Sequence, residues 1–196
     1  MSTTTAKEDP HSDPVSEKHA AILEAYQKPS YRYLVLSILT TVYVSNFVDR
    51  QVINVLAQPI IDDLNISDGQ IGMLSGLAFA FIYTTLAVPI ARWADISNRR
   101  NIVAASVAIW SVMTALCGAA QSFAQLFLAR FGVGVGEAGG SPPSHSIVSD
   151  IFPAEQRATA LSIYSLGVYG GILVGTVGGA YLVQYFDWRT AFVVVG

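Results

Sequence analysis

Residues 102–120 read IVAASVAIWSVMTALCGAA, an apolar run without a single charged side chain. A helix of about 20 residues crosses the hydrocarbon core of a bilayer, so this run is long enough to span a membrane. Further apolar runs, separated by short polar breaks, cover Leu34–Ile61, Ile71–Ala91, Ala124–Ser149 and Ala158–Phe186. A sixth run begins near Trp188 and is cut off at Gly196. The sequence therefore predicts an all-α membrane protein, with residues 34–196 forming one transmembrane bundle that stops early in helix six.

The composition supports this class and excludes several others. Hydrophobic residues make up 52% of the 196 residues and charged residues 13%, with a mean hydropathy of +0.46. A soluble domain carries about 25% charged residues, so this chain lacks the polar surface that a globule needs in water. A net charge of −3 gives no basic surface for nucleic acid, and a single cysteine allows no internal disulfide. The three histidines are too scattered for a conventional zinc site, and no cofactor is expected.

The basic residues predict the orientation in the membrane. Residues 1–33 are polar and mixed in charge, which is typical of a tail without a packed core. Arginines lie in the connections after the second and fourth runs, whereas the connections at 62–70 and 121–123 carry no Lys or Arg. By the positive-inside rule the tail is cytoplasmic. We expect a multi-pass protein, located in the plasma (inner) membrane if the source is bacterial.

Four formal charges lie within the five complete runs: Asp49 and Arg50 in the first, Arg130 and Glu137 in the fourth. An ionised side chain at mid-bilayer costs at least ~2.5–3.5 kcal/mol, so these four are expected to face one another or a shared cavity. One interpretation is a structural salt-bridge network that holds two helices in register. We favour the other, a substrate or proton site near the membrane midplane, because intramembrane ionisable groups usually have a function.

Polar and small residues extend this face along both helices. In the first run, a polar side chain recurs at every fourth residue, at Asn46, Arg50, Asn54 and Gln58. In the fourth run, the face of the two charges also carries Gly134, Ser141 and Ser144. Helical periodicity places each set on one side of its helix. Such faces are expected to line a cavity rather than to meet lipid.

The fifth run carries a glycine at every fourth position, at Gly167, Gly171, Gly175 and Gly179. Small residues at this spacing allow a second helix backbone to approach closely. That helix belongs either to the same chain or to a second copy in a dimer. For a protein with many helices we favour packing within the chain.

Several connections resemble those of the major facilitator superfamily. The loop ARWADISNRR at 91–100 resembles the signature between its second and third helices, and Arg130 through Gly134 to Gly136 resembles its fourth-helix motif. Similar later motifs are found at Asp150–Pro153 with Arg157, and at Asp187–Arg189 with Phe192 and Gly196. Within the superfamily, the stretches NFVDR at 46–50, GVGEA at 134–138 and LSIY at 161–164 look most like the spinster-like lipid transporters.

The resemblance implies a twelve-helix carrier built of two six-helix bundles, of which this chain is the N-terminal one. It implies a secondary active transporter of lysolipid or sphingoid amphiphiles, with proton coupling at Asp49 and Glu137. Substrate binding is assigned to Arg50, Arg130, Asn46, Asn54 and Ser141. A similar first-helix motif also occurs in organic anion symporters of the superfamily, so an organic anion/proton symporter or another small-molecule carrier is the alternative.

We expect the two halves to rock about a central site, with the C-terminal half as a required partner. Residues 1–196 alone are therefore expected to be a poor transporter. Protonation of a carboxylate would free its arginine to bind an anionic headgroup with two hydrogen bonds. Asp95, beside Arg99 and Arg100, is predicted to form a conformational latch, with simple solvation of the loop as the alternative.

Two other function classes are less consistent with the sequence. A channel needs a continuous pore with rings of ligands, whereas polar faces are found on only two helices. A membrane enzyme needs a nucleophile beside a base, for which His145 among its neighbouring serines is the sole candidate. A lone histidine there is more often a satisfied core residue, so no enzyme is predicted. The expected partners are an amphiphilic lipid or small organic anion, protons and membrane lipid, with no nucleic acid.

Overall fold

The structure is a computed structural model that describes residues 28–196. Most of the predicted tail, residues 1–33, lies outside this range. The first helix, α2, covers Pro29–Val55 and so begins within the last residues assigned to the tail. Proline suits the first turn of a helix because its missing N–H has no partner there in any helix. Tyr33 in this turn packs edge-on against Phe152, with ring centroids 5.8 Å apart.

The first predicted run contains a second, short helix. After a turn at the fully buried Leu56, the chain continues as α3, Ala57–Leu64. Asn65 ends this helix in the left-handed conformation, with a φ of 51°. Asparagine tolerates that conformation better than most residues, which explains the end of the helix.

The second run forms a continuous helical stretch with an unusual middle. Helix α4, Asp68–Gly72, starts at a capping box in which Ser67 and Gln70 bond reciprocally. A π-helical segment, η1 at Met73–Leu77, follows, and then α5 at Ala78–Ile96. Such π-helical turns are rare and are often found at functional sites.

The fourth run differs from the prediction of one helix over Ala124–Ser149. Helix α6, Arg99–Gly118, is followed by α7 at Phe123–Ala138 and then by a separate α8 at Ser141–Ile151. The break falls at Gly139 and Gly140, and α8 opens with prolines in its first turn. Proline within a continuous helix would clash with the preceding turn and remove a hydrogen bond, so the chain restarts a helix there instead.

Two further helices complete the described part. Helix α9 covers Ala154–Tyr185 and α10 covers Trp188–Val195. Asp187 caps α10 by accepting a hydrogen bond from the Thr190 backbone N–H at 2.7 Å. Hydrogen bonding to Thr190 holds the pKa of the Asp187 carboxyl below its ordinary value.

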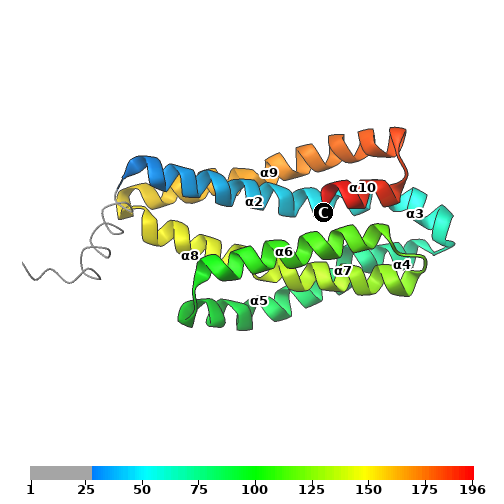
Figure 1. The fold of residues 1–196 in the computed structure, drawn as a ribbon, viewed down its shortest axis with the longest axis horizontal. Coiled ribbons are helices and arrows are strands. Elements are labelled where there is room, and N and C mark those ends of the chain that lie inside the picture. Colours follow the sequence, from blue (N-terminus) through cyan, green and yellow to red (C-terminus); the bar gives the residue numbers. More distant parts are fainter. Residues whose placement is uncertain (1–27) are drawn as a thin grey trace, which may run out of the picture.

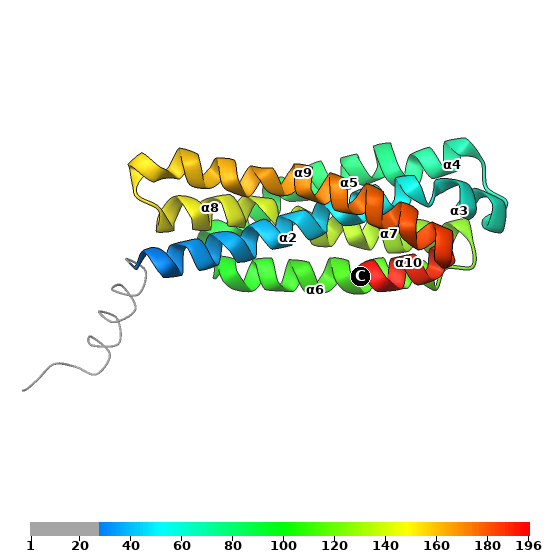
Figure 2. The same cartoon turned by 90° about the horizontal axis from the view of Figure 1, so that it is seen from above.

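The helices run roughly along the long axis of one bundle (Figure 1). The start of α2 and the α5–α6 and α8–α9 connections lie at one end, and the α3–α4, α6–α7 and α9–α10 connections lie at the other (Figures 1 and 2). Helix α2 packs extensively on α9, while α6 packs on α7 and α10. The predicted all-helical bundle is confirmed by this arrangement of the described residues.

The four glycines of α9 form the contact with α2. Gly167, Gly171, Gly175 and Gly179 are all buried. A Cβ atom added at Gly175 would lie 2.8 Å from the Gln51 Cβ and 3.0 Å from the Val48 backbone, which is too close for any side chain. The structure therefore uses this surface for packing within the chain.

Large apolar side chains cover much of the outside of the bundle. In α9 they include Leu166, Leu173 and Val177, each more than 60% exposed. By length and composition, three helical stretches of the described part can cross a membrane, at Asp68–Ala94, Arg99–Gly118 and Ala154–Tyr185. The first and fourth predicted runs are not among these three stretches. Helix α2 carries the charged Asp49 and Arg50, and the fourth run is divided into two shorter helices. An outer surface of this kind suits contact with lipid rather than water.

Candidate functional site

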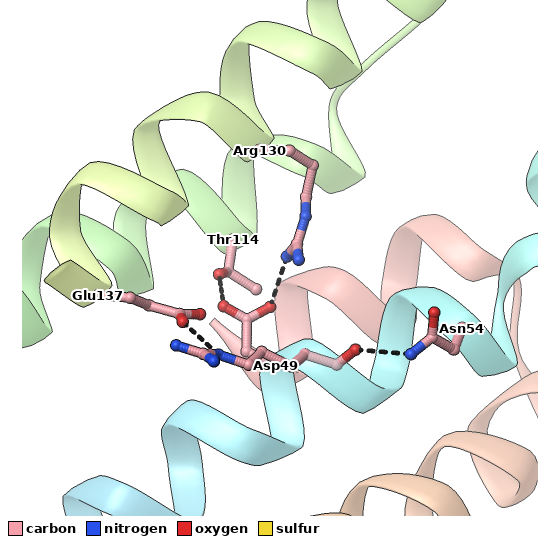
Figure 3. A network of polar contacts seen from close by, with 6 residues as sticks. Asp49, Asn54, Thr114, Arg130 and Glu137 are labelled. Atoms are coloured by element: carbon pink, nitrogen blue, oxygen red, sulfur yellow. Dashed lines mark hydrogen bonds and ion pairs between the residues drawn. The ribbon is translucent and has the colours of Figure 1, made fainter. Parts of the chain in front are cut away.

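The four intramembrane charges meet where α2, α6 and α7 approach each other (Figure 3). They form two ion pairs, one between Asp49 and Arg130 and one between Arg50 and Glu137. Each pair joins α2 to α7. Asp49 and Arg50 are consecutive residues, so helical geometry turns their side chains in different directions.

Asp49 and Arg130 form the fully buried pair. The Arg130 Nη1 atom donates to Asp49 Oδ1 at 3.1 Å, and the two side chains are 3% and 2% exposed. The Thr114 hydroxyl of α6 donates to the other carboxylate oxygen, Oδ2, at 2.5 Å (Figure 3). Both oxygens of Asp49 thus have a donor, which is what an ionised carboxylate needs when it is removed from water. Thr114 was not among the predicted site residues, and a single threonine in an apolar run carries no distinctive signal.

The second pair is asymmetric in its burial. Arg50 Nε donates to Glu137 Oε2 at 2.7 Å, and the glutamate is fully buried while the Arg50 side chain is 26% exposed. Arg50 therefore reaches from the buried carboxylate toward an open surface. The Asn54 amide stabilises the same turn by donating to the Arg50 carbonyl oxygen at 3.2 Å.

Aromatic rings surround the Arg50 guanidinium. Its central carbon lies 5.1 Å from the ring centroid of Phe47, 5.0 Å from that of Phe79 and 4.7 Å from that of Tyr83. Phe79 also lies near the second arginine, because the Arg130 guanidinium carbon is 5.4 Å from its centroid. Guanidinium groups are attracted to the faces of aromatic rings. These rings were missed in the sequence, where aromatic residues in an apolar run are indistinguishable from ordinary core residues.

A pocket of about 460 Å³ opens beside these residues. Both arginines reach it, with Phe47, Gln51, Asn54, Ser75, Phe79 and Ala80, and the glycines Gly72 and Gly76. Gly72 and Ser75–Gly76 come from α4 and the π-helical segment η1. The pocket combines cationic, amide and apolar surfaces, a combination suited to a ligand with a charged and an apolar part.

Three buried polar atoms of the site have no hydrogen-bond partner within the described residues: Arg130 Nε, Glu137 Oε1 and Asn46 Oδ1. Buried polar groups in proteins are nearly always paired, so each unpaired atom needs an explanation. Arg130 Nε is a donor and the other two atoms are acceptors. The site can therefore still donate a hydrogen bond to an anionic group and accept hydrogen bonds from a protonated group.

The sequence comparisons identify the family of this bundle. The family model described as Major Facilitator Superfamily matches residues 39–196. The chain belongs to this superfamily. An "MFS-type efflux pump" of Mycolicibacterium smegmatis is 37% identical over 86% of this chain, and "Protein spinster homolog 1" of Xenopus tropicalis is 31% identical over 83% of it. A solved bacterial homologue of the human lysosomal transporter Spinster, in an inward-facing and occupied conformation, superimposes with a TM-score of 0.75 at 41% identity.

The chain spans only part of these superfamily relatives. It covers 39% of the efflux pump, 32% of the Xenopus protein and 42% of the solved Spinster homologue, while 86% of this chain is matched in the solved structure. The predicted superfamily and its spinster-like type are confirmed by these matches. The relatives are named as transporters and pumps, so the prediction that the protein is not an enzyme is confirmed as well.

Within this superfamily bundle, not every predicted site residue reaches the pocket. Arg50, Arg130 and Asn54 line it, whereas Asn46 and Ser141 do not. Asn46 is buried one helical turn before Arg50, and Ser141 lies in α8 beyond the break at Gly139. The break at Gly139 and Gly140 thus separates Ser141 from the helix that carries Arg130 and Glu137.

The predicted latch residues lie at the end of the bundle that holds the α5–α6 connection. Arg99 forms an ion pair with Asp150 at the end of α8, a residue that was not predicted to belong to the latch. Arg100 is exposed, and its backbone N–H donates to the Asn98 side chain that caps α6. The side chain of Asp95 is outside the part of the chain that the structure describes.

His145 packs its ring edge against Tyr164 at 5.0 Å and is exposed. Among the described residues, no group of three or more His, Cys, Asp or Glu side chains is arranged to hold a metal ion.

Proposed function

We propose that the protein works as a secondary active transporter that moves lysolipid or sphingoid-type amphiphiles by alternating access, coupled to protons. The observation that carries the proposal is the pair of buried arginine–carboxylate contacts beside a pocket that is partly aromatic. The similarity to proteins named after Spinster supports a transporter of the spinster-like type, and the amphiphile as substrate follows from the resemblance described in the sequence analysis.

The pocket is suited to the two parts of an amphiphile. Arg50, Arg130 and Asn54 supply donors for an anionic headgroup, and arginine binds phosphate and carboxylate through two parallel hydrogen bonds. Phe47, Phe79 and the glycine-lined η1 segment supply apolar surface for the start of a hydrocarbon chain. Asn46 and Ser141 are proposed to bind substrate only in a state in which the bundle has moved.

Coupling follows from exchange of partners at the arginines. With Asp49 and Glu137 ionised, each arginine is neutralised by a carboxylate. When a carboxylate takes up a proton, its arginine loses this partner and becomes available to the headgroup. Loss of the proton restores the ion pair and releases the ligand. The second oxygen of Glu137, which is buried and has no hydrogen-bond donor among the described residues, is the proposed place for that proton.

The ion pair of Arg99 and Asp150 is proposed to contribute to a latch at the cytoplasmic end, with Asp95 and Arg100. Both of its side chains are partly exposed, and surface pairs contribute about 0–1 kcal/mol. An ion pair of this strength shifts the equilibrium between conformations but does not hold the protein in one of them.

The test is transport by the full-length protein in proteoliposomes, with a lysophospholipid as the probe and the external pH varied. We expect the Asp49→Asn, Glu137→Gln double variant to lose the pH dependence while remaining folded. Arg50→Lys and Arg130→Lys are expected to weaken transport of the anionic probe, because lysine keeps the charge but cannot bind with two parallel bonds. A double variant with the full pH response would overturn the mechanism.

An organic anion/proton symporter is the second candidate. Two arginines in the pocket are equally suited to a carboxylate, and a "Probable galactarate/D-glucarate transporter" of Bacillus subtilis is 28% identical over 90% of the chain. Uptake of a sugar diacid without uptake of the lysophospholipid would favour this candidate.

A further inference from the structure

We infer that the pocket selects an anion that carries a hydroxyl group, and that Gln51 is the residue that determines this specificity. The inference rests on the proposed function and deepens it by naming a chemical feature of the substrate. Both candidate substrates share this feature, because a lysophospholipid with a free glycerol hydroxyl and a sugar diacid are hydroxylated anions. Gln51 was not among the predicted substrate-binding residues.

The charged side chains that line the pocket are both cations. Arg50 and Arg130 line it. The carboxylates of Asp49 and Glu137 do not. A guanidinium group offers hydrogen-bond donors and no acceptor. The arginines can therefore bind the anionic group of a ligand, whereas a hydroxyl hydrogen of the same ligand needs an acceptor from another side chain.

Neutral side chains of the pocket supply such acceptors. Gln51, Asn54 and Ser75 line it, and each carries an oxygen that can accept a hydrogen bond. The Ser75 hydroxyl donates to the Ile71 carbonyl oxygen at 3.1 Å. The Asn54 amide nitrogen donates to the Arg50 carbonyl oxygen at 3.2 Å. Both bonds use a donor and leave the oxygen of the side chain as an acceptor, so the pocket has neutral acceptors beside its two cations.

Gln51 differs from the other two because its whole amide is available. Within the described residues its side chain makes no hydrogen bond, and it is half-buried where Asn54 is exposed. Water competes less for a half-buried amide than for an exposed one. Gln51 directly follows Arg50 and lies three residues before Asn54, which makes the two amides neighbours on the surface of α2.

The base of the Gln51 side chain is held by the close contact of α2 with α9. A Cβ atom added at Gly175 would lie 2.8 Å from the Gln51 Cβ, so the α9 backbone lies directly against it. The Gln51 atom in this contact is the Cβ, which every residue except glycine has. The amide can therefore be replaced while the packing of α2 on α9 is kept.

This arrangement has a consequence for specificity. A site that binds a substrate hydroxyl rejects the analogue without it, because the polar groups of the site then lose their partner. One neutral hydrogen bond corresponds to about a fivefold difference in affinity. The pocket should therefore bind a hydroxylated anion more tightly than the same anion without the hydroxyl.

The experiment measures the binding of two matched pairs of probes to the purified full-length protein. The lipid pair is a 1-acyl-glycerol 3-phosphate and its analogue without the free hydroxyl. The sugar-acid pair is D-glucarate and adipate, the same diacid without hydroxyl groups.

Each pair is tested with the unmodified protein and with Gln51→Met, which keeps the length of the side chain but removes the amide. Gln58→Met is the matched control, because Gln58 belongs to the polar face predicted for the first run but does not line the pocket. The apparent melting temperature in detergent reports on folding, and Gln51→Leu takes the place of Gln51→Met if that variant does not fold.

We expect the unmodified protein and Gln58→Met to bind the hydroxylated member of at least one pair about fivefold more tightly than the other member. In Gln51→Met this preference should disappear, because only the hydroxylated probe binds more weakly. Equal binding within both pairs in the unmodified protein would overturn the inference, as would a preference that persists in Gln51→Met, an equal loss for both members, or binding of none of the four probes. A preference in the sugar-acid pair without binding of either lipid probe would support the inference and overturn the amphiphile as substrate.

Discussion

At the scale of the residue, the hydrogen bond from Thr114 to Asp49 allows a prediction about stability. Its hydroxyl supplies one of the two donors to the buried Asp49 carboxylate, at 2.5 Å. Thr114→Val removes this donor with almost no change in shape and leaves one carboxylate oxygen unsatisfied. Side-chain hydrogen bonds between membrane helices average about 0.6 kcal/mol, and those to charged groups are stronger, so we expect a loss of about 1 kcal/mol. The free energy of unfolding in detergent measures it.

The matched control for this substitution is Thr114→Ser, which keeps the hydroxyl and should retain most of the stability. If Thr114→Val is as stable as the unmodified protein and transports with the same pH profile, the hydrogen bond to Asp49 has no role in the site.

At the scale of the element, the α2–α9 contact depends on glycines that leave no room for side chains. A Cβ atom at Gly175 would meet the Gln51 Cβ at 2.8 Å, whereas one at Gly178 meets nothing within 4 Å. Gly175→Leu should therefore force the helices apart and destabilise the bundle by at least about 1–3 kcal/mol, while Gly178→Leu should be nearly neutral. Thermal unfolding of the two variants tests this. Equal stability would show that the close approach is not needed.

The π-helical segment makes a separate prediction at the same scale. A Cβ atom at Gly76 meets nothing within 4 Å, and this residue lines the pocket. Gly76→Leu should thus fill part of the pocket without disturbing the fold. We expect unchanged thermal stability and weaker binding of a lysophospholipid probe, with Gly178→Leu as the control that adds the same side chain away from the pocket. Binding that stays equal in both variants would exclude this wall from the substrate site.

At the scale of the whole molecule, the bundle has two chemically different ends. The α5–α6 and α8–α9 connections, with Arg99, Arg100 and Arg157, lie at the end from which α2 starts (Figure 1). At the opposite end, the α3–α4 and α6–α7 connections carry no Lys or Arg, and Arg189 beside the α9–α10 connection is paired with Asp63. By the positive-inside rule, the arginine-rich end should face the cytoplasm.

Cysteine labelling tests this orientation in the full-length protein in cells. The exposed Asp68→Cys should react with a membrane-impermeant maleimide in intact cells, whereas the exposed Glu155→Cys should react only after permeabilisation. The full-length protein without either substitution is the control, and within residues 1–196 the single cysteine, Cys117, is fully buried. The reverse labelling pattern would invert the proposed topology.

The sequence alone was sufficient for the fold class and for the prediction that the four intramembrane charges meet. A long apolar run is stable in a membrane as a helix, because a helix satisfies its own backbone hydrogen bonds. Four charges within such runs are expected to pair, because an unpaired charge in the bilayer costs too much free energy. The glycine spacing in α9 likewise predicted close packing, which the structure places on α2. The break between α7 and α8 also has a signal in the sequence, because the stretch GGSPP at 139–143 carries strong helix-breaking residues, whereas apolar run length alone predicts one continuous helix.

Only the tertiary structure decided the pairing of the charges and the surroundings of the site. Arg50 and Glu137 are 87 positions apart, and Thr114 is 65 positions from the carboxylate it contacts. Local periodicity fixes which face of a helix a residue occupies, but not how two helices are rotated and shifted against each other. That relation is set by the packing of many side chains and glycines at once, and it brings Phe79 between two arginines that no sequence pattern connects to it.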